Sequence, residues 1–140
     1  MELIPQSIFQ KQMKILTWTD FQNAVAKIAN HYNGRAFNGV YGFPRGGLPL
    51  AVTLSHYLDL PLLSEIEEDC LIVDDIYETG KTLEPTRNFA GCSHAVWLTK
   101  AKGPLWYFAA EDAVPSEWIV FPWEDPSQAL KDQEEYYATH

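Results

Sequence analysis

Residues 70–82 read Cys-Leu-Ile-Val-Asp-Asp-Ile-Tyr-Glu-Thr-Gly-Lys-Thr, and this stretch decides the fold. It begins with a short apolar run, which is typical of a strand buried on both faces of a parallel sheet. The run ends in two carboxylates, Asp74 and Asp75. A glycine-containing turn over residues 78–82 follows, and we expect it to begin a helix. Because ligands of open α/β sheets bind at the carboxyl ends of the strands, the pattern predicts a binding site here.

The turn has the groups that bind a phosphate. Gly80 lets the main chain approach a ligand closely, Thr79 and Thr82 add hydroxyls, and a helix N-terminus offers free N–H groups. Asp74 and Asp75 would repel phosphate, so we expect them to bind sugar hydroxyls or a divalent metal ion. The alternative is that both acids are a solvated strand end. A nucleoside-triphosphate P-loop is excluded, because its first glycine would fall on Asp75.

A second anion-binding pattern lies one strand–helix unit earlier. Residues 39–43 predict a central strand, and residues 48–58 predict a helix with Pro49 in its first turn. Between them stands Pro-Arg-Gly-Gly, residues 44–47. Arg45 can pair with two phosphate oxygens, and Gly46 allows the backbone to come close. An ordinary turn is the alternative interpretation.

The remaining pattern predicts an α/β fold in which helices flank one mainly parallel sheet. We expect strands over 14–18, 60–63, 94–99 and 106–108, a helix over about 20–32 capped by Thr19 or Asp20, and a short helix from Lys81 that Pro85 limits. The predicted organisation is an N-terminal arm over 1–13, a single domain over 14–125 and a polar tail with a weak helical pattern over 126–140.

Composition narrows the function. The 140 residues, 46% of them hydrophobic, suit one domain, and no apolar run is long enough to span a membrane. The N-terminus lacks a secretory pattern, and the two cysteines have no metal-ligand spacing, so we expect a cytoplasmic protein with reduced thiols. A net charge of -9 argues against nucleic acid as a partner. The same charge opposes an anionic ligand unless amides, local cations and Mg²⁺ offset it.

The apolar strand followed by Asp-Asp-x-x-x-Thr-Gly-Lys-Thr resembles the phosphoribosyl-pyrophosphate (PRPP) signature of the type I phosphoribosyltransferases, most closely their xanthine-guanine and hypoxanthine (6-oxopurine) branch. Residues 43–48 resemble the pyrophosphate loop of this family, in which the peptide before the arginine is often cis. Residues 100–104 resemble its base-reading segment, and residues 118–124 resemble the C-terminal segment of the xanthine-guanine branch. The resemblance covers about residues 38–125.

The resemblance implies that the 5-phosphoribosyl group of PRPP is transferred to guanine, xanthine or hypoxanthine, with release of pyrophosphate. It assigns proton acceptance at the purine N7 to Glu78, which replaces the aspartate usual in the branch. PRPP would be bound by Arg45, Gly46, Asp74, Asp75, Thr79, Gly80, Lys81 and Thr82. The base would be bound by Lys100, with Lys102 as the nearest competitor, and by Trp118 and Ile119. Mg²⁺ would be held by Asp74, Asp75 and Glu124, and a homo-oligomer is expected.

The chain departs from the family between residues 63 and 70. Type I enzymes usually insert a long mobile loop there, which covers the site and excludes water. This sequence has a short, mostly acidic connection instead, so we expect the lid to be missing. One alternative function is therefore a lidless module that binds PRPP or a nucleotide and regulates a partner. Glu78 in place of aspartate leaves open a second alternative, transfer to another base or acceptor.

Overall fold

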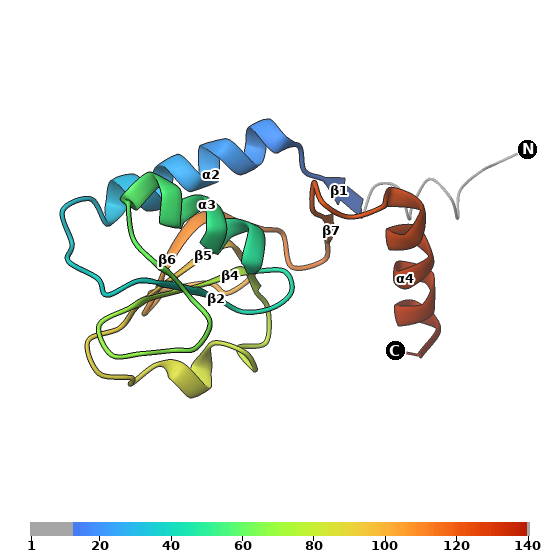
Figure 1. Ribbon diagram of the computed structural model, residues 1–140. Helices are drawn as coiled ribbons and strands as arrows, with labels where there is room; N and C mark the ends of the chain where they lie inside the picture. Colours follow the sequence, from blue (N-terminus) through green and yellow to red (C-terminus); the bar gives the residue numbers. More distant parts are fainter. Residues whose placement is uncertain (1–12, 140) are drawn as a thin grey trace, which may run out of the picture. The chain divides into compact units, whose positions relative to one another are not determined.

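The computed structural model describes residues 13–139 (Figure 1). The predicted N-terminal arm over 1–13 lies outside these residues, apart from Met13. Contacts between residues divide the described chain into a larger unit, residues 22–113, and a smaller unit, residues 13–21 with 114–139. The predicted boundaries at 13/14 and 125/126 stay predictions.

The larger unit is built on a five-stranded parallel sheet with the order β3-β2-β4-β5-β6. Its strands are β2 (Val40–Gly42), β3 (Leu62–Leu63), β4 (Leu71–Tyr77), β5 (Ser93–Thr99) and β6 (Phe108–Asp112). From β2 the chain crosses to β3 on one side, and it then returns to place β4 on the other side of β2. The direction of winding therefore reverses between β2 and β4, which is where ligands of such sheets bind. The prediction of an α/β fold with a mainly parallel sheet is confirmed.

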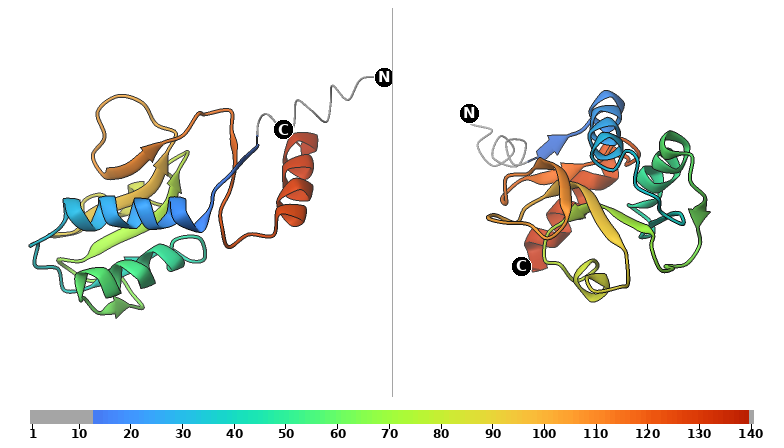
Figure 2. Two further views of the ribbon diagram at one scale, coloured as in Figure 1. Left: turned by 90° about the horizontal axis from the view of Figure 1, so that it is seen from above. Right: turned by 90° about the vertical axis from the view of Figure 1, so that its left-hand side faces the viewer.

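Helices lie on both sides of the five-stranded sheet and cover its apolar faces. Helix α3 (Leu48–Leu58) has the predicted bounds, and it lies with the part of α2 (Trp18–His31) that belongs to the larger unit on one side of the sheet (Figure 2). The short 3₁₀ helix η1 (Glu84–Thr86) lies on the other side (Figure 2). The core of the unit includes Ala24, Val25, Ile28, Leu50, Leu54, Leu71, Ile72, Val73, Val96, Trp97 and Leu98, all fully buried. Each large aliphatic side chain among them contributes about 1.5–3 kcal/mol to folding by leaving water.

Several predicted elements differ in their ends. β4 does not stop at the carboxylates but continues to Tyr77, because the ladder to β5 continues through Tyr77 and Thr99. The α-helix expected from Lys81 is the 3₁₀ helix η1 instead, since in an α-helix begun there the Pro85 ring would meet the Lys81 carbonyl. The strand expected over 106–108 begins only at Phe108.

The smaller unit has a two-stranded parallel sheet of β1 (Met13–Ile15) and β7 (Trp118–Val120), followed by α4 (Pro126–Thr139). The polar C-terminal segment, predicted as a tail, is thus helical. α2 begins in this unit with Thr17 as its cap rather than Thr19 or Asp20: the Thr17 amide donates to Asp20, and the Asp20 amide donates to the Thr17 hydroxyl. Across residues 13–139, no helix is both long and apolar enough to cross a membrane.

Candidate active site

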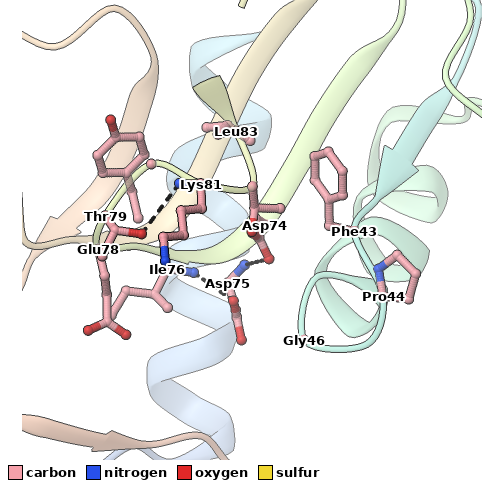
Figure 3. A pocket seen from close by; sticks show the side chains of 13 residues that line it. Phe43, Pro44, Gly46, Asp74, Asp75, Ile76, Glu78, Thr79, Lys81 and Leu83 are labelled. Atoms are coloured by element: carbon pink, nitrogen blue, oxygen red, sulfur yellow. Dashed lines mark hydrogen bonds between the residues drawn. The ribbon is translucent and has the colours of Figure 1, made fainter. Parts of the chain in front are cut away.

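A cavity of about 320 Å³ lies between the loops that follow β2 and β4 (Figure 3). It is therefore at the point where the winding of the sheet reverses. Its lining consists of Phe43, Pro44, Gly46, Asp74, Asp75, Ile76, Tyr77, Glu78, Thr79, Gly80, Lys81, Thr82 and Leu83. All residues predicted to bind PRPP line it except Arg45, which is exposed in the loop beside Gly46.

The loop after β2 is held against β4. The Phe43 amide donates to the Val73 carbonyl at 3.1 Å, and the Gly47 amide donates to the Phe43 carbonyl at 2.8 Å. A Cβ atom added to Gly46 would overlap the carboxylate of Asp75, so glycine lets this loop lie close to the Asp75 side chain of β4. The peptide between Pro44 and Arg45 is cis, as the resemblance implied.

Asp74 and Asp75 are adjacent residues of β4 and are largely enclosed. The Asp74 carboxylate accepts a hydrogen bond from the Asp75 amide at 2.8 Å, and the Asp75 carboxylate accepts one from the Ile76 amide at 2.8 Å (Figure 3). Burial, with the charge of Asp75 next in importance, raises the pKa of Asp74 to about 8. Burial also raises the pKa of Asp75. Two carboxylates of this kind favour a partner that brings positive charge or hydrogen-bond donors.

The turn after β4 is shaped by Gly80, whose φ of +84° is a left-handed conformation that favours glycine. A Cβ atom there would also lie 2.5 Å from the Tyr77 hydroxyl oxygen. The Glu84 amide donates to the Gly80 carbonyl at 2.9 Å, and the Lys81 amide lies 3.4 Å from the Thr79 hydroxyl (Figure 3). Since the three-residue η1 replaces an α-helix, a phosphate here would depend on the turn's own amides, hydroxyls and Lys81 rather than on a helix dipole.

A donor and an acceptor come together beside the cavity. The ammonium of Lys100 lies 3.2 Å from the carboxylate of Glu78, and the Lys100 amide donates to the Tyr77 carbonyl at 2.9 Å. The Lys100 side chain is only 14% exposed, whereas that of Glu78 is 53% exposed. The competing Lys102 is exposed in the following loop. The ends of β4 and β5 thus bring together two of the residues predicted to act on a base.

Sequence reasoning missed Tyr77, which lines the cavity at the end of β4. Its ring stacks on Tyr107 with centroids 4.6 Å apart, and its hydroxyl donates to the Glu84 carboxylate at 2.8 Å. The Trp106 indole donates to the same carboxylate, also at 2.8 Å. The sequence prediction ended this strand at the paired acids, so Tyr77 was assigned to the turn. Only the continuation of β4 to Tyr77 in the structure brings this residue to the cavity.

The other predicted site residues belong to the smaller unit. Trp118 and Ile119 begin β7, and the Trp118 ring lies 5.4 Å from that of Tyr136 in α4. The exposed Glu124 accepts a hydrogen bond from the Phe121 amide at 2.8 Å. Their predicted roles toward a base and a metal stay predictions.

The donor set for Mg²⁺ is incomplete without a substrate. Within the described part of the chain, no group of three or more histidine, cysteine, aspartate or glutamate side chains is arranged to hold a metal ion. Asp74 and Asp75 supply two carboxylates, which fits Mg²⁺ because this ion commonly takes one or two carboxylates together with substrate oxygens. The residues present therefore fit a metal that is bound jointly with a phosphorylated ligand.

The chain is similar to known proteins in both sequence and fold. The chain is 26% identical over 117 residues to a xanthine-guanine phosphoribosyltransferase of Desulfotalea psychrophila, covering 66% of this chain and 73% of the relative. A purine phosphoribosyltransferase structure from Pyrococcus horikoshii is 27% identical with a TM-score of 0.69, covering 81% of this chain and 95% of that one. A xanthine-guanine-hypoxanthine phosphoribosyltransferase structure from Helicobacter pylori, 21% identical, shares the fold with a TM-score of 0.64, covering 86% and 99%. No protein-family model matches. In sequence the chain is thus similar to purine phosphoribosyltransferases, and its fold is that of the type I phosphoribosyltransferases.

Proposed function

We propose that the protein transfers the 5-phosphoribosyl group of PRPP to a 6-oxopurine, with guanine, xanthine and hypoxanthine as candidate bases. The observation that carries this proposal is the Lys100–Glu78 pair, 3.2 Å apart, beside the cavity that follows β4. The relatives named above act on purines, which supports the same choice.

The pair presents two complementary groups to the edge of a base. The Lys100 ammonium is a donor for the oxygen at C6 of an oxopurine, and the Glu78 carboxylate is an acceptor for the N–H at N7. Adenine has an amino group at C6, so it would face Lys100 donor to donor. Such a mismatch discriminates by leaving buried polar groups unpaired.

The sugar phosphate would bind across the two loops. The hydroxyls of Thr79 and Thr82, with the amides of the turn, suit the 5-phosphate, while Asp74 and Asp75 suit the two ribose hydroxyls. The loop that contains Arg45 and Gly46 suits the pyrophosphate. Mg²⁺ held by Asp74 and Asp75 together with substrate oxygens would neutralise charge on the leaving pyrophosphate. The roles of Glu124, Trp118 and Ile119 in the same reaction are part of the proposal.

In the reaction, N9 of the purine forms a bond to C1 of the ribose, and the bond from C1 to the pyrophosphate oxygen breaks. Glu78 accepts the proton from N7, so the nucleotide leaves with a neutral purine ring. Positive charge develops at C1 as the leaving group departs. Positioning of both substrates by the two loops is the main contribution of the protein.

Two predictions about the protein's setting belong to the same proposal. The connection between β3 and β4 comprises only residues 64–70, so the site would work without the long lid of the family. We also propose that the enzyme is a cytoplasmic homo-oligomer.

The test is pyrophosphate release from PRPP with Mg²⁺ and each of guanine, xanthine, hypoxanthine and adenine. We expect release with at least one oxopurine and little with adenine. Glu78→Gln should lower kcat by about a hundredfold or more. The control Glu65→Gln changes an exposed glutamate in the β3–β4 connection and should leave kcat unchanged. PRPP binding without release for any oxopurine would refute the catalytic proposal and favour a binding module.

A further inference from the structure

The two cysteines of the chain are neighbours in the fold. Cys70 directly precedes β4 and Cys92 directly precedes β5, and their sulfur atoms lie 3.7 Å apart as free thiols. The first paired residues of these two strands are Leu71 and Ser93. The closeness of the sulfur atoms therefore follows from the register of the parallel ladder, which is visible as adjacent strands in Figure 1.

Main-chain hydrogen bonds fix the backbone on both sides of the pair. The Asp69 amide donates to the Ala90 carbonyl at 3.0 Å, and the Ser93 amide donates to the Cys70 carbonyl at 3.1 Å. The sulfur atoms lie 3.7 Å apart, so formation of a disulfide needs them to approach by less than about 2 Å.

The two thiols differ in access. Cys70 is fully buried, whereas Cys92 is partly exposed and its sulfur lies 3.2 Å from the Glu67 carbonyl. Burial raises the pKa of Cys70 to about 11. A reagent from solution therefore reaches Cys92 first, and Cys70 reacts only with a sulfur already bound beside it.

We propose that Cys70 and Cys92 form a redox modification site, at which a low-molecular-weight disulfide converts the two thiols into an intramolecular disulfide. The Cys92 thiolate attacks one sulfur of the reagent, which forms a mixed disulfide and releases one thiolate. Cys70 then attacks the Cys92 sulfur, and its proton passes to the second thiolate, which leaves as a thiol. The protein thiols lose two electrons and two protons, and the reagent is reduced to two thiols.

The disulfide would close a covalent ring over residues 70–92. This ring contains all of β4, both acids of the cavity and the turn over residues 78–82. The modification would therefore tie together the amino-terminal ends of the two strands whose other ends carry Glu78 and Lys100. The inference is independent of the reaction proposed above, because it rests only on the sulfur positions and their access.

The test treats the folded full-length chain with oxidised glutathione, quenches with acid, alkylates under denaturing conditions, and measures intact and peptide masses. We expect the mass to fall by about 2 Da, with one peptide joining Cys70 to Cys92, and dithiothreitol to reverse both changes. Cys92→Ser should remain unmodified, and Cys70→Ala should stop at a glutathione adduct on Cys92.

Three results in the wild-type protein would overturn the proposal. The first is that both thiols are still alkylated after treatment with oxidised glutathione. The second is that a glutathione adduct on Cys92 persists, and the third is that the disulfide joins two chains. Since each is read in the wild-type protein, the test does not depend on whether the variants fold. Modification of Cys70 in the Cys92→Ser variant would refute the proposed order of attack.

Discussion

The free energy of unfolding of the wild-type protein should decrease between about pH 5 and pH 7, and Asp74→Asn should make this decrease smaller. In the folded chain, burial keeps the pKa of Asp74 at about 8. In the unfolded chain an aspartate has a pKa of about 3.9. The folded state therefore holds a proton that the unfolded state releases, so the free energy of unfolding decreases as the pH rises through this window.

The magnitude follows from the proton count. One proton held only by the folded state gives a slope of about 1.4 kcal/mol per pH unit, so the fall from pH 5 to pH 7 is about 2–3 kcal/mol. The pKa of Asp75 is also raised, which adds a change of the same sign. Asp74→Asn removes one of the two groups that hold a proton only in the folded state, so the slope becomes smaller.

The assay is urea unfolding of the wild type and of Asp74→Asn at several pH values, with Asp112→Asn, an exposed aspartate at the end of β6, as the control. Burial lowers the pKa of His94, which makes stability rise with pH below about 6.5. This opposing change is common to all three proteins and cancels in their differences. Equal slopes for the wild type and Asp74→Asn would refute the reasoning.

Three further substitutions test the site and the core. Lys100→Gln should raise KM for the purine by about tenfold or more, because a charged donor is lost, while Lys102→Gln should not; equal effects in steady-state kinetics would contradict the assignment. Gly46→Ala should lower kcat/KM for PRPP by at least about tenfold, since the added methyl group would displace the Asp75 carboxylate that it overlaps; unchanged kinetics would show that this carboxylate need not keep its position. Leu98→Ala, at a fully buried position of β5, should cost about 2–5 kcal/mol in chemical denaturation, and Leu62→Ala, at a residue 47% exposed, should cost far less.

Much of the larger unit could be predicted from the sequence because local signals and packing agree there. The start of α3 could be predicted from the Gly-Gly turn before it and from Pro49 in its first turn. The buried run at the start of β4 could be recognised because both of its faces are apolar. The position of the cavity then follows from the parallel order of the strands.

The rest could not be predicted because it depends on pairing between distant residues. Tyr77 belongs to β4 because it pairs with Thr99 in β5, and the sequence near residue 77 does not indicate this pairing. The C-terminal segment is weakly patterned, with Ala129 and Gln133 as its buried positions, so its helix gave little signal. The 3₁₀ helix is different, because its signal is local: the Pro85 ring opposes an α-helix that begins at Lys81.

The ladder between β2 and β4 has a consequence for which ligands can be accepted. These strands are direct neighbours, joined by register pairs from Val40 with Leu71 to Gly42 with Val73. Backbone pairing therefore sets the spacing between the strand ends from which the two loops start. A molecule with two anionic ends that contacts both loops has to bridge this spacing, so the sheet limits the length of the ligand.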